Sequence, residues 1–205
     1  MISKFGRTAV LSFLLLGTFA LKSQLSAQPS AQLTPSEMIQ IRSVEAEKIA
    51  SPRYAVDVRG QSTKNDGSLQ WLEVSVEFDT RLKWTDEITF TMYVVLQGKP
   101  ENLPEGAQPV NMFSGTVTIV NVPQVKKGNL SMYLDPYTLA RYGEPTHVAV
   151  VATIDGEPAA GIAEPSSSAA SQWWTRQTPN ATPLLSRDKT PYIFVEIDGQ
   201  NTIQP

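Results

Sequence analysis

Hydrophobic and polar residues alternate along much of the chain from residue 38 onward. Successive side chains of a β-strand point to opposite faces, so a strand with one face in a core and one in water produces this period of two. The clearest stretch covers residues 69–82, which we predict to form one long strand. Its buried face would carry Leu72, Val74, Val76, Phe78 and Leu82, and its polar face Glu73, Ser75, Glu77, Asp79 and Arg81.

Several further stretches have the character of strands. Residues 88–97 repeat the alternation, with Ile88, Phe90, Met92, Val94 and Leu96 on one face. Residues 113–122, 130–134, 146–154 and 192–197 are short, β-branched or alternating, and bounded by Pro, Gly or Asn. We predict a strand at each.

A hairpin is predicted between residues 53–59 and residues 69–82. Tyr54, Val56 and Val58 share one face of its first strand. Lys64-Asn65-Asp66-Gly67 lies between the two, and its Asn and Gly tolerate the positive φ of a tight turn.

Three segments depart from simple alternation. Residues 38–49 suit either a strand or a helix, and we favour the strand. Residues 135–142 are compatible with one helical turn that crosses between sheets. Residues 159–182 are rich in small residues and are predicted to form a long surface excursion with a short strand at residues 172–176. A loop of this length is usually either functional or mobile.

Seven to eight short strands in a single domain, residues 38–205, indicate an all-β fold. We predict an immunoglobulin-like antiparallel β-sandwich and leave its strand order open. The chain contains no cysteine. The disulfide of antibody domains is therefore missing, and the core alone must hold the fold.

The first residues have the order of parts found in an export signal. Lys4 and Arg7 precede an apolar run over residues 9–21, and Ala27 is a small residue suited to cleavage. That run would span about 20 Å as a helix, less than a hydrocarbon core of roughly 30 Å. We predict that residues 1–27 form a signal peptide, and that residues 28–37 form a flexible lead.

Charge and residue types exclude several classes of function. The chain has 17 basic and 20 acidic residues, and loss of Lys4, Arg7 and Lys22 with the signal would leave a net charge of −6. Such a domain has no electrostatic attraction to nucleic acid or anionic lipid. With one histidine, His147, and no cysteine, a zinc site or an activated nucleophile is not supported. We expect His147 to be a partly exposed residue at a strand end.

No catalytic, metal or cofactor site is predicted. Asn65-Asp66-Gly67 and Asp155-Gly156-Glu157 are the nearest approaches to a calcium loop, but both have the composition of ordinary hairpin turns. A pair of carboxylates that meets only in the folded chain would leave no mark in the sequence. A hydrolase therefore remains the third and weakest functional alternative.

The tryptophans are the candidates for an interface or for ligand stacking: Trp71, Trp173 and Trp174. Trp71 is in register with Glu73 and Ser75 on the polar face of its strand. If residues 173 and 174 are extended, one of the two indoles points outward. Exposed indoles anchor protein interfaces or stack on sugars, whereas the alternative is that residues 159–182 cover them.

Taken over residues 36–205, the chain resembles a group of small secreted immunoglobulin-like proteins encoded alongside type IV pilus-like machinery in gut bacterial envelopes. The resemblance lies in the general pattern of an exported, cysteine-free chain of alternating strands and not in a diagnostic motif. Examples of these strands are Trp71-Leu-Glu-Val-Ser-Val-Glu-Phe78 and Ile88-Thr-Phe-Thr-Met-Tyr-Val-Val95. The chain differs from pilins, because Leu11 stands where bacterial pilins place a glutamate. The resemblance therefore implies an accessory protein rather than a fibre subunit.

This resemblance implies a non-enzymatic interaction module located in the periplasm, on the outer cell surface or in the medium. Its partners would be envelope or pilus proteins, without a membrane span once the signal is removed. Self-association is a further option, since the polar arm at residues 28–37 could extend to a neighbouring sheet edge. The alternative function is a carbohydrate-binding module that uses exposed tryptophans.

Overall fold

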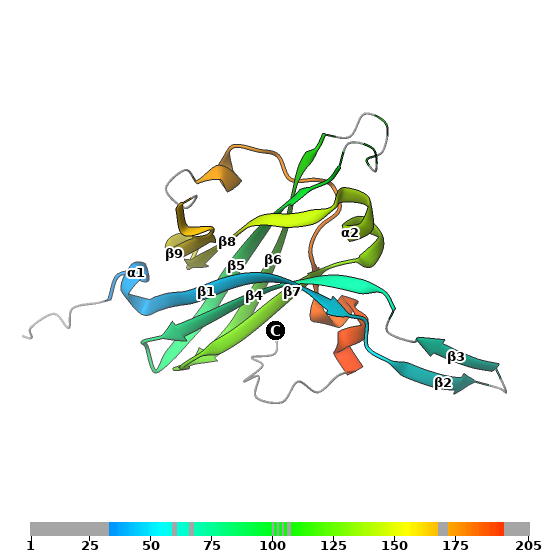
Figure 1. Cartoon of the computed structure of the whole chain (residues 1–205). Helices are drawn as coiled ribbons and strands as arrows, with labels where there is room; N and C mark the ends of the chain where they lie inside the picture. The colour runs from blue at the N-terminus through cyan, green and yellow to red at the C-terminus, as the bar shows by residue number, and fades with distance from the viewer. Residues whose placement is uncertain are drawn as a thin grey trace, which may run out of the picture. The chain divides into compact units, whose positions relative to one another are not determined.

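Two antiparallel four-stranded sheets pack against each other (Figure 1). The computed structural model describes residues 33–58, 61–65, 68–99, 101, 103, 105, 108–167 and 172–194. The first sheet has the order β1 (Ile39–Ala50), β4 (Gln70–Thr80), β7 (Gly128–Leu134) and β10 (Leu185–Ser186). The second has the order β6 (Val110–Pro123), β5 (Trp84–Gln97), β8 (Glu144–Ile154) and β9 (Glu157–Glu164). The predicted all-β sandwich is confirmed.

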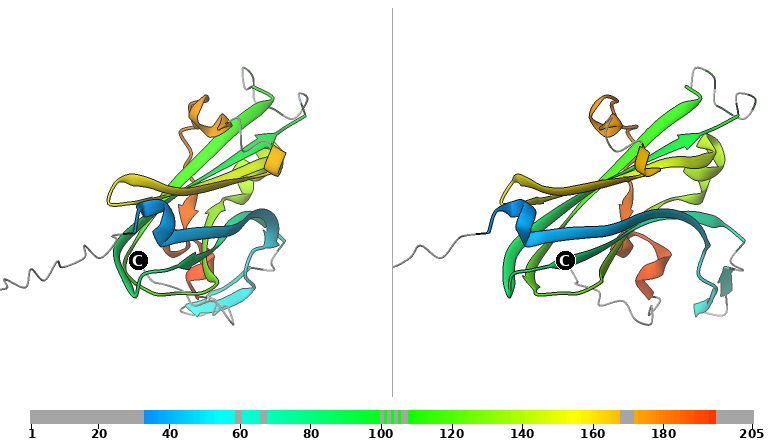
Figure 2. Two further views of the ribbon diagram at one scale, coloured as in Figure 1. Left: turned by 90° about the vertical axis from the view of Figure 1, so that its left-hand side faces the viewer. Right: turned by 60° about the vertical axis from the view of Figure 1, so that its left-hand side comes forward.

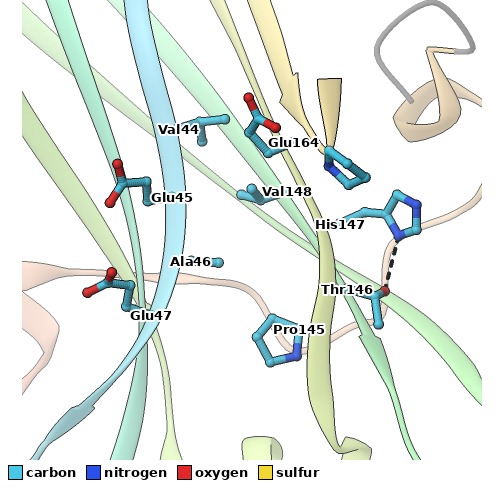
Figure 3. A pocket seen from close by; sticks show the side chains of 10 residues that line it. Val44, Glu45, Ala46, Glu47, Pro145, Thr146, His147, Val148 and Glu164 are labelled. Atoms are coloured by element: carbon cyan, nitrogen blue, oxygen red, sulfur yellow. Dashed lines mark hydrogen bonds between the residues drawn. The ribbon is translucent and has the colours of Figure 1, made fainter. Parts of the chain in front are cut away.

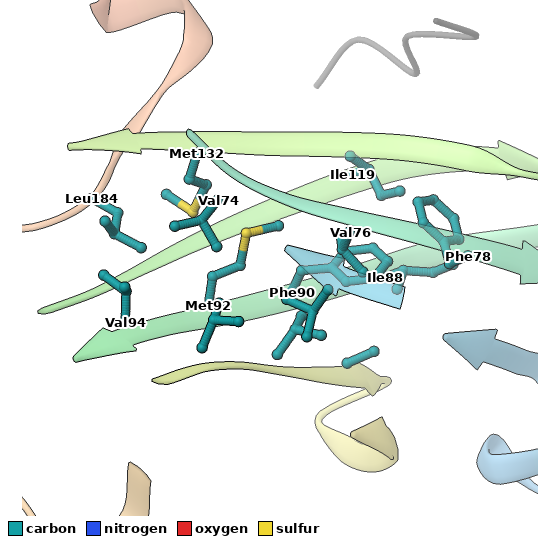
Figure 4. Close-up of a cluster of buried hydrophobic side chains, with 14 of the residues drawn as sticks. Val74, Val76, Phe78, Ile88, Phe90, Met92, Val94, Ile119, Met132 and Leu184 are labelled. Atoms are coloured by element: carbon teal, nitrogen blue, oxygen red, sulfur yellow. The ribbon is translucent and has the colours of Figure 1, made fainter. Parts of the chain in front are cut away.

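The core fills the space between the sheets with side chains from alternate positions, as Figure 4 shows for its central part. Phe78 on β4 and Phe90 on β5 meet across the sandwich, with ring centroids 4.8 Å apart. In β4 and β5 the predicted inward residues are buried: Leu72, Val74, Val76, Phe78, Ile88, Phe90, Met92, Val94 and Leu96. Leu82 is the exception, because β4 ends at Thr80.

The predicted partner of residues 53–59 is wrong. β2 (Tyr54–Val58) pairs with β3 (Gln61–Asn65), and β4 pairs with β1 and β7 instead. Alternation identifies a strand but carries no information about its partner. Residues 59, 60, 66 and 67 lie outside the described part of the chain.

The segment that follows β8 also differs from expectation. Asp155 and Gly156 form the predicted hairpin turn, with positive φ values of 53° and 79°, and β9 then occupies the start of the expected excursion. Residues 173–175 form a 3₁₀ turn, η3 (Trp173–Thr175), in place of a strand. The strand predicted at residues 192–197 is likewise wrong where it is described, because η5 (Pro191–Phe194) is a 3₁₀ turn.

Two short helices flank strands. α1 (Pro35–Met38) is one turn that leads into β1, so the choice of a strand at residues 39–49 is confirmed. α2 (Pro136–Tyr142) is the predicted helical turn. The Asp135 carboxylate caps it by accepting hydrogen bonds from the backbone amides of Tyr137 and Thr138, each at 3.0 Å.

The C-terminal segment covers one side of the sandwich. The amide of Asn180 donates to the Met112 carbonyl at 2.7 Å, and the amide of Leu184 donates to the Ser114 carbonyl at 2.9 Å. Both carbonyls belong to β6, the edge strand of the second sheet. The chain then forms β10 against β7, at the edge of the first sheet. Figure 2 shows this segment running from one sheet to the other.

A charged cluster around Asp79 on β4 joins the N-terminal end of β1 to the loop between β6 and β7. The pairing of β1 with β4 shifts between Ile41 and Ser43, so Arg42 is an extra residue whose side chain can turn toward Asp79. Arg42 Nε donates to Asp79 Oδ1 at 2.9 Å, and Arg42 Nη2 contacts Asp79 Oδ2. The backbone amide of Lys127 also donates to Asp79 Oδ1, at 2.9 Å.

The predicted signal peptide, residues 1–27, and the first part of the lead, residues 28–32, lie outside the described part of the chain. Among the described residues, no helix has both the length and the apolar character needed to cross a membrane.

Candidate functional site

A groove of about 360 Å³ runs along the side of the sandwich that the C-terminal segment leaves open. One wall is formed by residues 44–47 of β1, the edge strand of the first sheet. The other is formed by residues 145–148 of β8 and by Glu164 and Pro165 at the end of β9. We call it the lateral groove (Figure 3).

The two faces of β1 give the lateral groove its chemistry. Val44 and Ala46 lie on the side of β1 that faces β8, and Pro145 and Val148 lie opposite them (Figure 3). Glu45 and Glu47 alternate with them and point away from the groove, as neighbours in a strand must. The groove is therefore apolar inside and acidic along one rim.

Charge is unevenly distributed around the groove. Glu45, Glu47 and Glu164 are all exposed. Lys48 Nζ lies 2.5 Å from Glu144 Oε1 and ties the end of β1 to the start of β8. Neither Glu45 nor Glu47 forms a salt bridge with any residue that the structure describes. The Glu47 position also pairs directly with Glu73 across the sheet, a like-charge pairing that is unfavourable.

An aromatic cluster adjoins the groove on β8. His147 is half-buried at the start of the strand, as predicted, and its Nδ1 lies 3.1 Å from the Thr146 hydroxyl. The Trp173 ring meets the His147 ring edge-to-face at 5.9 Å, and the Trp174 ring meets Trp173 at 5.6 Å. Both indoles are half-buried. Trp173 thus contacts a residue of the groove wall, but the His147 ring points away from Val44 and Ala46 (Figure 3), and neither indole lines the groove itself.

Trp71 lies elsewhere, on the outer face of the first sheet. It is 8% exposed and packs with Tyr133 and Tyr192 in a cluster of its own. The Tyr192 ring stacks on Tyr133 at 4.9 Å and meets Trp71 edge-to-face at 5.9 Å. The cover over Trp71 therefore comes from η5 rather than from residues 159–182. Burial, together with the nearby Glu73 carboxylate, raises the pKa of Tyr192 to about 12.

Replacement of Tyr192 by Phe tests how this cover is held. The Tyr192 hydroxyl donates a hydrogen bond to the Ala50 carbonyl at 2.8 Å. Tyr192→Phe keeps the ring contacts but removes the donor, so we expect the free energy of unfolding to fall by about 1 kcal/mol. Urea denaturation followed by tryptophan fluorescence measures it. Tyr137→Phe is the control, because Tyr137 is 76% exposed. Equal effects of the two changes would contradict the role of this bond.

The described residues contain no group of three or more His, Asp or Glu side chains arranged to hold a metal ion. The carboxyl with the largest depression of its pKa is Asp79, and the Arg42 guanidinium and the Lys127 amide that cause it serve to join strands. What the lateral groove can do is bind an extended, mostly apolar ligand along an unpaired strand edge.

Sequence reasoning identified the indoles but missed the groove. Its walls come from β1 and β8, which are about a hundred positions apart along the chain, and only the strand order brings them together. The alternation of Val44, Glu45, Ala46 and Glu47 was the available signal. It predicts an amphipathic strand, but it cannot say that the strand lies at an edge.

Comparison with known proteins supports the fold. A family model matches residues 30–204. A crystal structure of a protein from Akkermansia muciniphila is similar to this chain, with a TM-score of 0.54 and 21% sequence identity. The similarity covers 82% of this chain and 94% of that protein. No curated protein matches the sequence.

Proposed function

We propose that this chain, which belongs to the family whose model matches residues 30–204, is an exported, non-enzymatic interaction module of the bacterial envelope that acts with a pilus. The lateral groove is the observation that carries this proposal. It is an unpaired strand edge with an apolar interior, a form suited to a protein partner.

The arrangement of strands supports an immunoglobulin-like type of sandwich. β1-β4-β7 in one sheet and β6-β5-β8-β9 in the other have the positions of strands A-B-E and C′-C-F-G in such domains. Domains with this architecture commonly serve recognition, but fold alone does not assign a function. The specific support comes from the groove and from the half-buried indole pair that packs on His147.

Trp173 and Trp174 belong to the proposed interface. The Trp173 ring contacts His147, whose side chain points away from the groove on the other side of β8 (Figure 3). Half-buried indoles are frequent anchors of protein interfaces, since they bury a large apolar area with little loss of conformational entropy. Trp71 is a structural residue in this proposal, because it is covered within the chain.

The experiment is an affinity isolation from the bacterium that encodes the protein. We expect the tagged full chain to recover pilus subunits or pilus assembly proteins from the envelope fraction. Ala46→Arg places a long charged side chain in the lateral groove and should reduce that recovery severalfold. Ala140→Arg on the exposed side of α2 is the control. Recovery of no pilus component by the unaltered chain, with the protein correctly exported, would overturn the proposal.

A further inference from the structure

We propose that the edge of β1 at residues 44–47 accepts one extended strand of a partner protein, in which basic residues alternate with small apolar ones. This inference rests on the proposed function and names the chemistry of the partner. The bound strand would extend the first sheet by one member, adjacent to β1.

The edges of the two sheets differ in their availability. At the β6 edge, the amides of Asn180 and Leu184 already bond to strand carbonyls, and β10 occupies the β7 edge. α1 packs against β9 on the remaining side. Among the described strands, β1 has β4 as its only pairing partner. On its other side β1 also contacts β9, and over residues 44–47 its open edge borders the lateral groove.

Apolar and acidic side chains alternate along β1, so apolar and basic side chains must alternate along the bound strand. Residues that are cross-strand neighbours lie on the same face of a sheet. Side chains of the bound strand beside Val44 and Ala46 would enter the groove and meet Pro145 and Val148. These ligand side chains must be apolar and of small or moderate size, because the whole groove has a volume of only about 360 Å³.

The remaining side chains of the bound strand would lie beside Glu45 and Glu47. These two carboxylates are exposed, form no salt bridge with a described residue, and have Ser75 and Glu73 as their neighbours on β4. A Lys or Arg at these ligand positions would supply the missing opposite charge on the open side of β1. Charge complementarity therefore selects a basic strand.

The N-terminal arm of a second copy fits this site less well. Residues 28–37 include two prolines, which cannot donate a backbone hydrogen bond, and an acidic residue, but no Lys or Arg. The chain as a whole has a net charge of −3, so a second copy is also repelled. A different, basic partner satisfies both the backbone edge and the carboxylates.

The test uses a synthetic peptide of alternating Lys and Val, with blocked ends and a fluorescent label. We expect fluorescence anisotropy to detect binding to the exported chain, and binding to weaken as salt is added. A peptide of the same composition with its lysines grouped at one end should bind at least severalfold more weakly. Hydrogen exchange should slow at those amides of residues 44–47 that point away from β4 when the alternating peptide is bound.

Charge reversal provides the matched variants. Glu45→Lys with Glu47→Lys should weaken binding of the Lys and Val peptide about tenfold, because two favourable cross-strand pairs become repulsive. Asp86→Lys with Glu87→Lys makes the same change of net charge at exposed positions of β5 and should leave binding unaltered. A peptide of alternating Glu and Val should bind the Glu45 and Glu47 variant in preference to the unaltered chain.

The outcomes separate this inference from the proposed function. Equal loss of binding in both charge variants, or protection of amides elsewhere than residues 44–47, would overturn strand addition at β1. Dimerisation that depends on residues 28–37 and excludes the peptide would replace the basic partner with a second copy. In either case, recovery of pilus components by the tagged chain would still support the envelope role.

Discussion

Gly115→Ala is expected to destabilise the protein by about 3 kcal/mol, although alanine is the better strand residue. Gly115 lies in β6, where the C-terminal segment passes close to the strand. A Cβ atom there would lie 2.5 Å from Met132 Cε, 2.7 Å from Leu184 Cβ and 2.9 Å from the Leu184 carbonyl oxygen. The Met132 side chain can move aside. The Leu184 backbone cannot move without stretching its hydrogen bond to Ser114.

Gly161→Ala is the matched control for this prediction. Gly161 also lies in an edge strand, β9, but a Cβ atom there would meet nothing closer than the Val150 carbonyl oxygen at 3.5 Å. We expect that change to be neutral or slightly stabilising, because it only lowers the entropy of the unfolded chain. Urea denaturation of both variants gives the comparison. Similar stabilities would mean that the C-terminal segment does not need its close approach to β6.

The sequence predicts features that depend on local patterns better than features that depend on contacts between distant segments. Period-two alternation located β4 and β5 with their buried faces, because burial on one face is a local property of a strand. The order of strands was left open, and the partner of residues 54–58 was predicted wrongly. Pairing depends on contacts between distant segments, which alternation does not encode. The C-terminal segment likewise follows β6 through backbone hydrogen bonds, which any sequence could make.

The 3₁₀ turns show a second limit. Residues 173–175 and 191–194 carry bulky aromatic or β-branched residues, which favour strands by propensity. In the folded chain these residues cover outer faces: Tyr192 covers Trp71, and Trp173 packs on His147. Their conformation follows from the surface they must cover. For this reason the sequence identified Trp173 and Trp174 as candidates but could not place them against His147 on β8.

Asp79→Asn is expected to lower the free energy of unfolding by about 2 kcal/mol near neutral pH. The Asp79 side chain is only 6% exposed and holds Arg42, the Lys127 amide and Lys126 Nζ, the last at 3.7 Å. The Arg42 guanidinium and the Lys127 amide hold the pKa of this carboxyl far below its usual range, against the opposing effect of burial. Asparagine keeps the shape but loses the charge that makes these bonds strong.

The pH dependence distinguishes this charge effect from a simple packing defect. A carboxyl whose pKa is lowered by folding stabilises the protein above its unfolded pKa of about 3.9, and that contribution disappears as the pH falls toward the folded pKa. The unaltered protein should therefore lose stability between about pH 5 and about pH 2, and Asp79→Asn should lose less. Asp86→Asn, at an exposed position of β5, should follow the unaltered protein throughout. A stability difference between Asp79→Asn and the unaltered protein that stays constant down to about pH 2 would contradict the ion-pair origin, since the carboxyl would then contribute through its shape alone.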